Sequence, residues 1–263
     1  MQSEIRHNPD FGLVRVVFDQ PGEQVITEAG AMVARDTAID MKTNMQGGLG
    51  GALKRKLLGG ESLFQNTFTA TAPGQSIWIA PPSEGAVEVI NLQPGMEIFM
   101  QSGAYLASTP GVTLDTKWQG AKGFFSGGLF LIRAYGQGQI WFSSYGGLHA
   151  VDLGQQYSGY ICDNSHMVAF TAGLQYNVSK LGGLKSLFFS GEGLVCNFQG
   201  QGRLWISTRN PSGSRVSRNR PPTQVLTVSH RSSPRVMAMG GATGGADMHR
   251  SYNCATMLGR GLI

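Results

Sequence analysis

An all-β fold made of three tandem units is the architecture that this sequence predicts. It rests on a tryptophan phrase that occurs three times, a second phrase repeated upstream of it, and a composition rich in glycine. The tryptophan phrase reads QSIWIA at 75–80, QGQIWFSS at 137–144 and QGRLWIST at 201–208. Its tryptophans, Trp78, Trp141 and Trp205, stand 63 and 64 residues apart. Landmarks that recur at such regular spacing indicate a duplicated unit.

The upstream phrase introduces a strand in each unit. Its copies are GAMVAR at 30–35, GAYLAS at 103–108 and SHMVAF at 165–170. Each is followed by a run in which apolar and polar residues alternate, at 39–45, 112–118 and 174–179. Period-2 alternation predicts a half-buried strand with one face in a core and the other in water.

A third landmark completes the unit. The glycine turns GGESLF (59–64), SGGLFL (126–131) and SGEGLV (190–195) each precede a strand that we expect to end at the tryptophan. We therefore predict three β-units, 1–82, 83–149 and 150–213, each a small curled sheet. The alternation also predicts that the tryptophans are buried, so the repeated phrase is interpreted as architecture rather than chemistry.

Composition supports this interpretation and restricts the partners. The chain has 263 residues, 41% of them hydrophobic, enough for a substantial core, and its 38 glycines are about twice the average share. Only 14% of the residues are charged, which suits tight turns and burial against copies of the same chain.

The net charge of +5 is concentrated in the C-terminal tail. Residues 214–263 hold seven arginines and one acidic residue, whereas residues 1–213 hold fourteen basic and fifteen acidic ones. A basic surface for nucleic acid is therefore not expected on the folded part. The tail is rich in Arg, Ser, Pro and Gly and is predicted to be disordered or irregular. It is either a partner-binding arm or an extension foreign to the fold, for example from a change of reading frame.

Catalytic and metal chemistry is not indicated. Cys162, Cys196 and Cys254 have no metal-ligand or disulfide spacing, and the five histidines do not pair with them. His166 takes a position where the other units have alanine, which we interpret as a turn or interface histidine. The carboxylates form no acid–base pair, GES at 60–62 lacks the second glycine of a nucleophile elbow, and GGLGGALKRKLLGG (47–60) contains no Gly-Lys pair. We predict no enzyme activity, no cofactor and no metal.

The same glycine-rich segment is an insertion of about ten residues relative to the other units. It combines leucines with three basic residues, and the matching loops place phenylalanines beside a lysine. The predicted rim-loop residues are Leu49, Leu53, Lys54, Arg55, Lys56, Leu57, Leu58, Phe124, Phe125, Phe188 and Phe189. Such loops could pack on their own unit, meet a neighbouring subunit or touch an anionic membrane. Three basic residues contribute about 1 kcal/mol each at such a membrane, whereas each buried leucine contributes about 1.5–3 kcal/mol, so protein contact is favoured.

These segments, GGLGGALKRKLLGGESLF, FSGGLFL and FFSGEGLV, resemble the altered-inheritance-of-mitochondria family, member twenty-four of that series. The resemblance covers about residues 1–210 and ends at the tail. It implies a fold like the tryptophan RNA-binding attenuation protein, with modules of double-stranded β-helix or β-sandwich type. It also implies a homotrimeric ring with pseudo-ninefold symmetry, and the mitochondrial relative is linked to inner-membrane organisation.

Two functions remain open from the sequence. The leading one is a non-enzymatic oligomeric scaffold or binding module, a homo-oligomer with a trimer favoured, acting through its rim loops on a protein or membrane-surface partner. The alternative is a small-ligand or RNA binder that uses clefts between adjacent modules. RNA binding would need phosphate-facing cations and exposed aromatic rings, and we do not expect it. The polar opening MQSEIRHNPDFG and the lack of a long apolar run predict a cytoplasmic protein, with contact to a membrane surface left open.

Overall fold

The computed structural model describes residues 1–45, 64–115, 131–154, 159–180 and 194–210. The chain divides into two units, Met1–Arg220 and Pro221–Ile263, and every described residue belongs to the first. All the predicted rim-loop residues lie outside the described residues, as does the tail from residue 211 onward.

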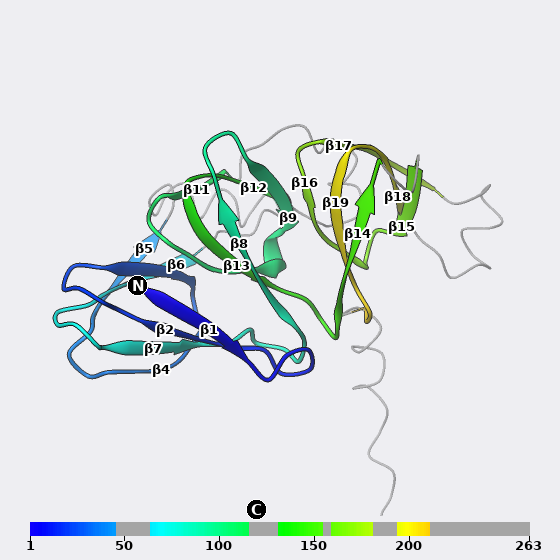
Figure 1. The fold of residues 1–263 in the computed structure, drawn as a ribbon. Coiled ribbons are helices and arrows are strands. Elements are labelled where there is room, and N and C mark those ends of the chain that lie inside the picture. The colour runs from blue at the N-terminus through cyan, green and yellow to red at the C-terminus, as the bar shows by residue number, and fades with distance from the viewer. Residues whose placement is uncertain (46–63, 116–130, 155–158, 181–193, 211–263) are drawn as a thin grey trace, which may run out of the picture. The chain divides into compact units, whose positions relative to one another are not determined.

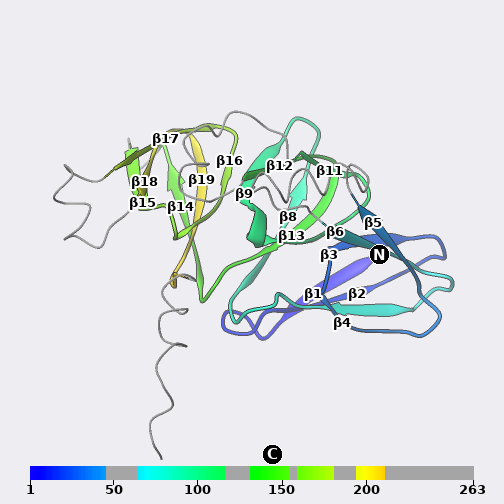
Figure 2. The same cartoon turned by 180° about the vertical axis from the view of Figure 1, so that it is seen from behind.

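The described part is built of antiparallel β-strands in four sheets, joined by turns and one short 3₁₀ turn, η1 (Ser102–Ala104). The first sheet has the order β1 (Gln2–Arg6), β2 (Leu13–Val17), β7 (Ser76–Ile79) and β4 (Met32–Arg35). The second has the order β5 (Asp40–Met45), β6 (Phe64–Thr69), β3 (Gln24–Glu28), β10 (Tyr105–Ser108), β13 (Gly138–Ser143) and β8 (Val87–Leu92). Figure 1 shows these strands from one side, and Figure 2 shows them from behind.

The two remaining sheets contain the later strands. The third sheet has the order β11 (Val112–Asp115), β12 (Leu131–Gly136), β9 (Glu97–Gln101), β16 (Met167–Thr171), β19 (Gly202–Ser207) and β14 (Leu148–Leu153). The fourth has the order β15 (Gly159–Asp163), β18 (Leu194–Gly200) and β17 (Leu174–Lys180). The prediction of an all-β fold is confirmed.

One order of pairing occurs three times along the chain. In the first strand set, β2–β7, the pairing orders are β2-β7-β4 and β3-β6-β5. The second set, β8–β13, has β8-β13-β10 and β9-β12-β11, and the third, β14–β19, has β14-β19-β16 and β15-β18-β17. Positions that hold the same place in this pattern are called equivalent below. The residue limits 1–82, 83–149 and 150–213 of the predicted units stay predictions.

The three repeated tryptophans occupy equivalent positions. Trp78, Trp141 and Trp205 lie on β7, β13 and β19, and each faces an alanine on the neighbouring strand. These partners, Ala34, Ala107 and Ala169, follow a shift of register in all three cases. A bulge changes the direction of the side chains beyond it. In each copy of the upstream phrase it places the alanine opposite the tryptophan. Trp141 and Trp205 are buried, whereas Trp78 is only half-buried.

The expectation that one strand runs from each glycine turn to the tryptophan is wrong. Two consecutive strands stand there in each set, β6 and β7, β12 and β13, and β18 and β19, and the two belong to different sheets. In the third set the chain passes from one sheet to the other at Gly200 and Gly202, whose φ values are 101° and 159°. A Cβ on Gly202 would lie 2.3 Å from the hydroxyl oxygen of Thr171. Glycine is therefore required at this crossing, which the sequence pattern alone did not distinguish from a continuing strand.

Three apolar cores lie between the sheets. The first joins Val14, Val16 and Phe18 to Trp141 of the second set. The second core likewise includes Trp205 of the third set. The third core, around Phe170, Cys196 and Phe198, contains no tryptophan among the described residues. Each of the first two cores is thus closed by the strand set that follows it.

Two junctions, named here by their strands, connect the sets. At the first junction β3 pairs with β10, and at the second β9 pairs with β16. Strand β4 is equivalent to β10 and β16, and strand β15 is equivalent to β3 and β9. Strands β4 and β15 each pair on one side only within the described part of the chain, and so form sheet edges.

A groove between the second and third strand sets

The described residues enclose one sizeable groove between the second and third sets. Its volume is about 690 Å³, a size at which proteins commonly hold a small molecule or a peptide side chain. Strands β8, β9, β14 and β19 and the turn before β9 supply its apolar wall: Ile90, Leu92, Met96, Ile98, Leu153 and Trp205. Met96 is 42% exposed, so an apolar surface is open to an incoming group.

Local sequence explains why these side chains point into the groove. On β8, Ile90 and Leu92 are two residues apart and face the same side of the sheet. They pair with Ile140 and Gly138 of β13, and Gly138 leaves room beside Leu92 because it has no side chain. On β19, Gly202 passes Thr171 closely, and the Arg203 amide donates a hydrogen bond to the Thr171 hydroxyl at 3.0 Å. This contact fixes the start of β19 and with it the position of Trp205.

Two ion pairs border the groove. The Arg203 guanidinium donates two hydrogen bonds to the Asp152 carboxylate, at 2.7 and 2.8 Å, and lies over the Trp205 ring. The Arg133 guanidinium likewise donates two hydrogen bonds to the Glu97 carboxylate. These hydrogen bonds hold the pKa of Asp152 and of Glu97 below their ordinary values. Both carboxylates are therefore ionised and matched by a cation, an arrangement suited to holding a ligand at an apolar wall.

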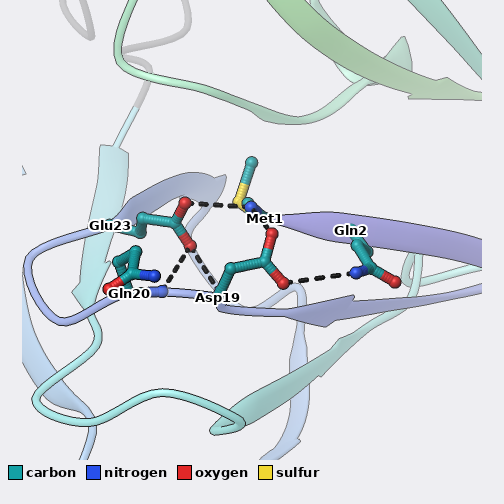
Figure 3. Close-up of polar contacts among 5 residues, drawn as sticks. All are labelled: Met1, Gln2, Asp19, Gln20 and Glu23. Carbon is teal, nitrogen blue, oxygen red and sulfur yellow. Dashed lines mark hydrogen bonds and ion pairs between the residues drawn. The ribbon is translucent and has the colours of Figure 1, made fainter.

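A related place between the first and second sets is filled by the chain itself. Met1 packs against the first core, and its ammonium group donates hydrogen bonds to the carboxylates of Asp19 and Glu23, the latter at 2.9 Å (Figure 3). The Glu23 carboxylate also accepts hydrogen bonds from the backbone amides of Asp19 and Gln20. Only a smaller hollow of about 300 Å³, bordered by Met1, Glu23 and Thr109, is left there.

The two cysteines of the third core are free and buried. Cys162 and Cys196 face one another across β15 and β18. Burial raises the pKa of each thiol to about 12, so both stay protonated and are poor nucleophiles near neutral pH. His166 donates or accepts at its Nδ1, which lies 2.8 Å from the carbonyl oxygen of Ser207, and so fastens the turn before β16 to the end of β19.

The groove residues were not identified from the sequence. Gln201, Gly202, Arg203 and Trp205 belong to the third tryptophan phrase, which was interpreted as architecture alone. The phrase has the same Gln-Gly pair in its second copy, so it carried no sign that one copy borders an open groove. The place between the first and second sets is covered by strand β1. No described strand covers the groove between the second and third sets in the same way.

The described residues contain no group of three or more His, Cys, Asp or Glu side chains placed to hold a metal ion. Nor do they include a helix long and apolar enough to cross a membrane.

Comparison with known proteins gives consistent matches over most of the chain. The family model described as Mitochondrial biogenesis AIM24 matches residues 3–209. An uncharacterised protein of Streptococcus pyogenes serotype M6 is 27% identical over 220 residues, which is 80% of this chain and 86% of that protein. A crystal structure of a Streptococcus pyogenes protein has a TM-score of 0.68 and 25% identity, covering 82% of this chain and 97% of the other.

Proposed function

This chain belongs to the Mitochondrial biogenesis AIM24 family, and we propose that it is a non-enzymatic oligomeric scaffold whose copies join edge to edge. One observation carries the proposal: the two junctions inside the chain have open counterparts at its two ends, β4 and β15. Unpaired strand edges readily accept another strand, so proteins cover them or pair them.

The β4 end is more exposed than its equivalents. Val33 on β4 is 58% exposed, whereas the equivalent Leu106 and Val168 are 0% and 5% exposed. Trp78 lies beside it, covered by the guanidinium groups of Arg6 and Arg15 at 5.2 and 5.4 Å from the ring centre. This face of the first sheet is equivalent to the faces that the second and third sets bury in the preceding core.

The β15 end has the complementary feature. Ile161 on β15 is 60% exposed, whereas its equivalent Phe99 on β9 is 7% exposed and lies at a junction. The third core also lacks the tryptophan that the following set contributes to the first two cores. Trp78 and Val33 of a second copy match the side chains that would complete it.

The internal junctions fix the register between copies. At the second junction Ala169 faces Met100 and Phe170 faces Phe99. The equivalent pairs between copies are Ala34 with Cys162 and Arg35 with Ile161. Such a contact joins two different surfaces, so it continues from copy to copy until a ring closes. We propose a homotrimer for that ring.

A cysteine pair tests this register. Arg35→Cys and Ile161→Cys are made as separate proteins, with Cys254→Ser in both. Paired cysteines on adjacent antiparallel strands lie within disulfide range, so mild oxidation of the mixture is expected to give a covalent dimer. Cys162 and Cys196 should not interfere, because burial raises the pKa of each thiol to about 12.

The matched control replaces Glu4, an exposed residue of β1, by Cys and pairs it with Ile161→Cys. Native mass measurement should give three times 28.1 kDa for the unmodified chain. A single-chain mass at every concentration, or equal crosslinking of the control, would contradict edge-to-edge assembly.

The partner of this scaffold is proposed to meet the rim loops, which include Leu49, Leu53, Lys54, Phe124 and Phe188 among the residues predicted from the sequence. In this proposal the protein is cytoplasmic and reaches a protein or an anionic membrane surface through these loops. Deletion of residues 47–58 tests the proposal. It should abolish flotation with phosphatidylserine-containing vesicles, or capture of the partner, while the oligomer mass is retained. Unchanged association would remove the rim loops from the proposal.

Binding in the groove between the second and third sets is a second candidate function. The groove of about 690 Å³ with an apolar wall favours it. Both bordering arginines are already paired with carboxylates, so the groove favours an apolar or peptide ligand over RNA phosphates. The neutral dye Nile red tests it: binding should occur and should be weakened by Met96→Lys. Equal binding by that variant would contradict the candidate function.

A further inference from the structure

Strand β1 has no counterpart in the second and third sets among the strands that the structure describes. It pairs with β2 at the end of the first sheet, whereas the equivalent strands β8 and β14 are themselves the ends of their sheets. Within the described residues, β8 pairs with β13 alone. The groove lies at this bare side of β8.

The register of β1 shows what such a strand does. Ser3 faces Val16 and Ile5 faces Val14, and side chains opposite one another in an antiparallel pair share a face of the sheet. Met1 and Ile5 accordingly pack against the first core. Under this cover Val16 is 0% exposed, whereas its equivalent Ile90 in the groove is partly exposed.

The bare side of β8 already accepts an amide group at one end. The Asn8 side-chain amide donates to the Val87 carbonyl oxygen at 2.7 Å, and the Val87 amide donates to the Asn8 oxygen at 3.0 Å. This is the pair of bonds that a neighbouring strand would make. Since alternate residues of a strand present their N–H and C=O groups to the same side, Val89 and Asn91 present theirs in line with Val87.

We propose that an extended peptide segment of a partner protein binds antiparallel along β8 and places alternate side chains in the groove. The segment adds a strand to the sheet, and its backbone supplies the partners for Val89 and Asn91. This inference specifies the ligand of the second candidate function and rests on that function, and it is independent of assembly.

Residue differences between β2, which β1 covers, and the equivalent β8 indicate which side chains the segment should carry. Glu88 stands where the first set has Val14, so the residue equivalent to Ile5 should be basic. Glu88 adds a negative charge beside two ion pairs that are already matched. Its field is one of the influences that raise the pKa of Arg203, after the hydrogen bonds that Arg203 donates to Asp152, which places Glu88 near the groove.

The other end of the segment should be apolar and need not be a chain terminus. The carboxylates of Asp19 and Glu23, which hold the Met1 ammonium group, are replaced at the equivalent positions by Gln93 and Met96. An apolar side chain facing Leu92 and Met96 therefore suits the groove, with a small side chain facing Ile90 in the place of Ser3.

A synthetic peptide provides the probe. Acetyl-MQSEKR carries residues 1–6 with lysine in place of Ile5, a fluorophore joined through its C-terminal amide and no free α-amino group. Binding to the full chain is measured by fluorescence anisotropy. A peptide N-methylated at the backbone of its glutamine and glutamate serves as control, because those residues face Asn91 and Val89 in the proposed register. The control should bind at least about tenfold more weakly, because it loses two backbone hydrogen bonds.

Variants of the protein test the side-chain contacts. Met96→Lys should weaken binding about tenfold or more by placing a charge on the apolar wall. Glu88→Lys should weaken the lysine peptide and improve a matched peptide with glutamate in that position. His149→Lys, at the exposed equivalent position on β14, should leave both affinities unchanged.

Each possible result of these measurements either supports or overturns the inference. Preference for the unmethylated peptide, together with the charge exchange at Glu88, supports the inference. Binding that ignores N-methylation, or no binding of the peptide at millimolar concentration, overturns it. If the peptide fails while Nile red still binds wild type better than Met96→Lys, the groove binds ligands but not a strand.

Discussion

Trp141 and Trp78 hold the same position in two consecutive strand sets, yet their surroundings differ. Trp141 is 0% exposed inside the first core, whereas Trp78 is half-buried under two arginine side chains. The sequence around them is similar, so the difference comes from what packs on the sheet. The first strand set covers Trp141, whereas no strand set among the described residues covers Trp78. Local sequence thus specifies the strand, and the neighbouring set decides whether its outer face belongs to a core.

The largest expected effect separates these two tryptophans. Trp141→Ala should lower the free energy of unfolding by about 3–5 kcal/mol, because it empties a fully buried site. Trp78→Ala should cost about 1 kcal/mol, since it removes a partly exposed ring and two cation–π contacts. Denaturant unfolding of both variants at one protein concentration measures the difference.

The comparison also predicts where Trp78 matters more. If copies assemble through β4, Trp78→Ala should weaken the oligomer although it hardly changes unfolding. Equal costs for the two substitutions, with an unchanged oligomer mass, would break the comparison between a covered and an uncovered sheet face.

An intermediate effect is expected at the glycines where the chain passes from β6 to β7 and from β12 to β13. Gly138 has a φ of 143°, and a Cβ there would lie 2.0 Å from the Thr109 hydroxyl oxygen. Gly74 in the first set has a φ of 81° and nothing within 4 Å of the added atom. Gly138→Ala should therefore cost about 2–3 kcal/mol, from strain and a clash, and Gly74→Ala about 1 kcal/mol, from strain alone.

Thermal or denaturant unfolding of the two alanine variants tests this difference. Substitutions of Thr109 separate the clash from the strain. Thr109→Ser is the control, because it keeps the hydroxyl that accepts a hydrogen bond from the Gln139 amide at 3.1 Å. Thr109→Ala in the Gly138→Ala background should recover part of the loss by removing the clashing oxygen. No recovery would assign the whole cost to backbone strain.

These features show which parts of the fold a sequence can predict. The alternating runs became β5, β11 and β17, because period-2 patterns are local and directly reflect a half-buried strand. The tryptophan phrase marked β7, β13 and β19 for the same reason. The change of sheet before each tryptophan was missed, because a glycine bend inside an apolar run has the composition of one long strand.

A cleft between adjacent modules was one alternative from the sequence, but the residues of the groove could not be predicted, because the groove lies where a covering strand is absent among the described residues. Ile90 and Val16 read alike in sequence, and the difference between them is that β1 lies over one and not over the other. Only the pairing of strands far apart in the chain reveals which apolar face is left open. The rim-loop residues, such as Leu53 and Phe188, stay predictions, since they lie outside the described residues.

The smallest expected effect concerns Tyr105, which stands where the first set has Met32 and the third has Met167. Its hydroxyl accepts a hydrogen bond from the Gln65 side chain at 3.1 Å and donates to the Ile26 carbonyl oxygen at 3.2 Å. Burial raises the pKa of Tyr105 to about 12, whereas an exposed tyrosine titrates near pH 10. The folded state therefore keeps a proton that the unfolded state loses.

This stabilisation is fully present below pH 10 and is lost as the pH rises through 12. At neutral pH, Tyr105→Phe should cost about 1 kcal/mol through its lost hydrogen bonds. Between pH 10 and 12 the stability of wild type should fall more steeply than that of the variant, so the difference between them shrinks or reverses. Urea unfolding at pH 8, 10 and 11 measures it, with Met167→Leu as a control whose cost should not change with pH. A difference between Tyr105→Phe and wild type that stays constant over this range would show that the buried hydroxyl does not distinguish the second set from the first.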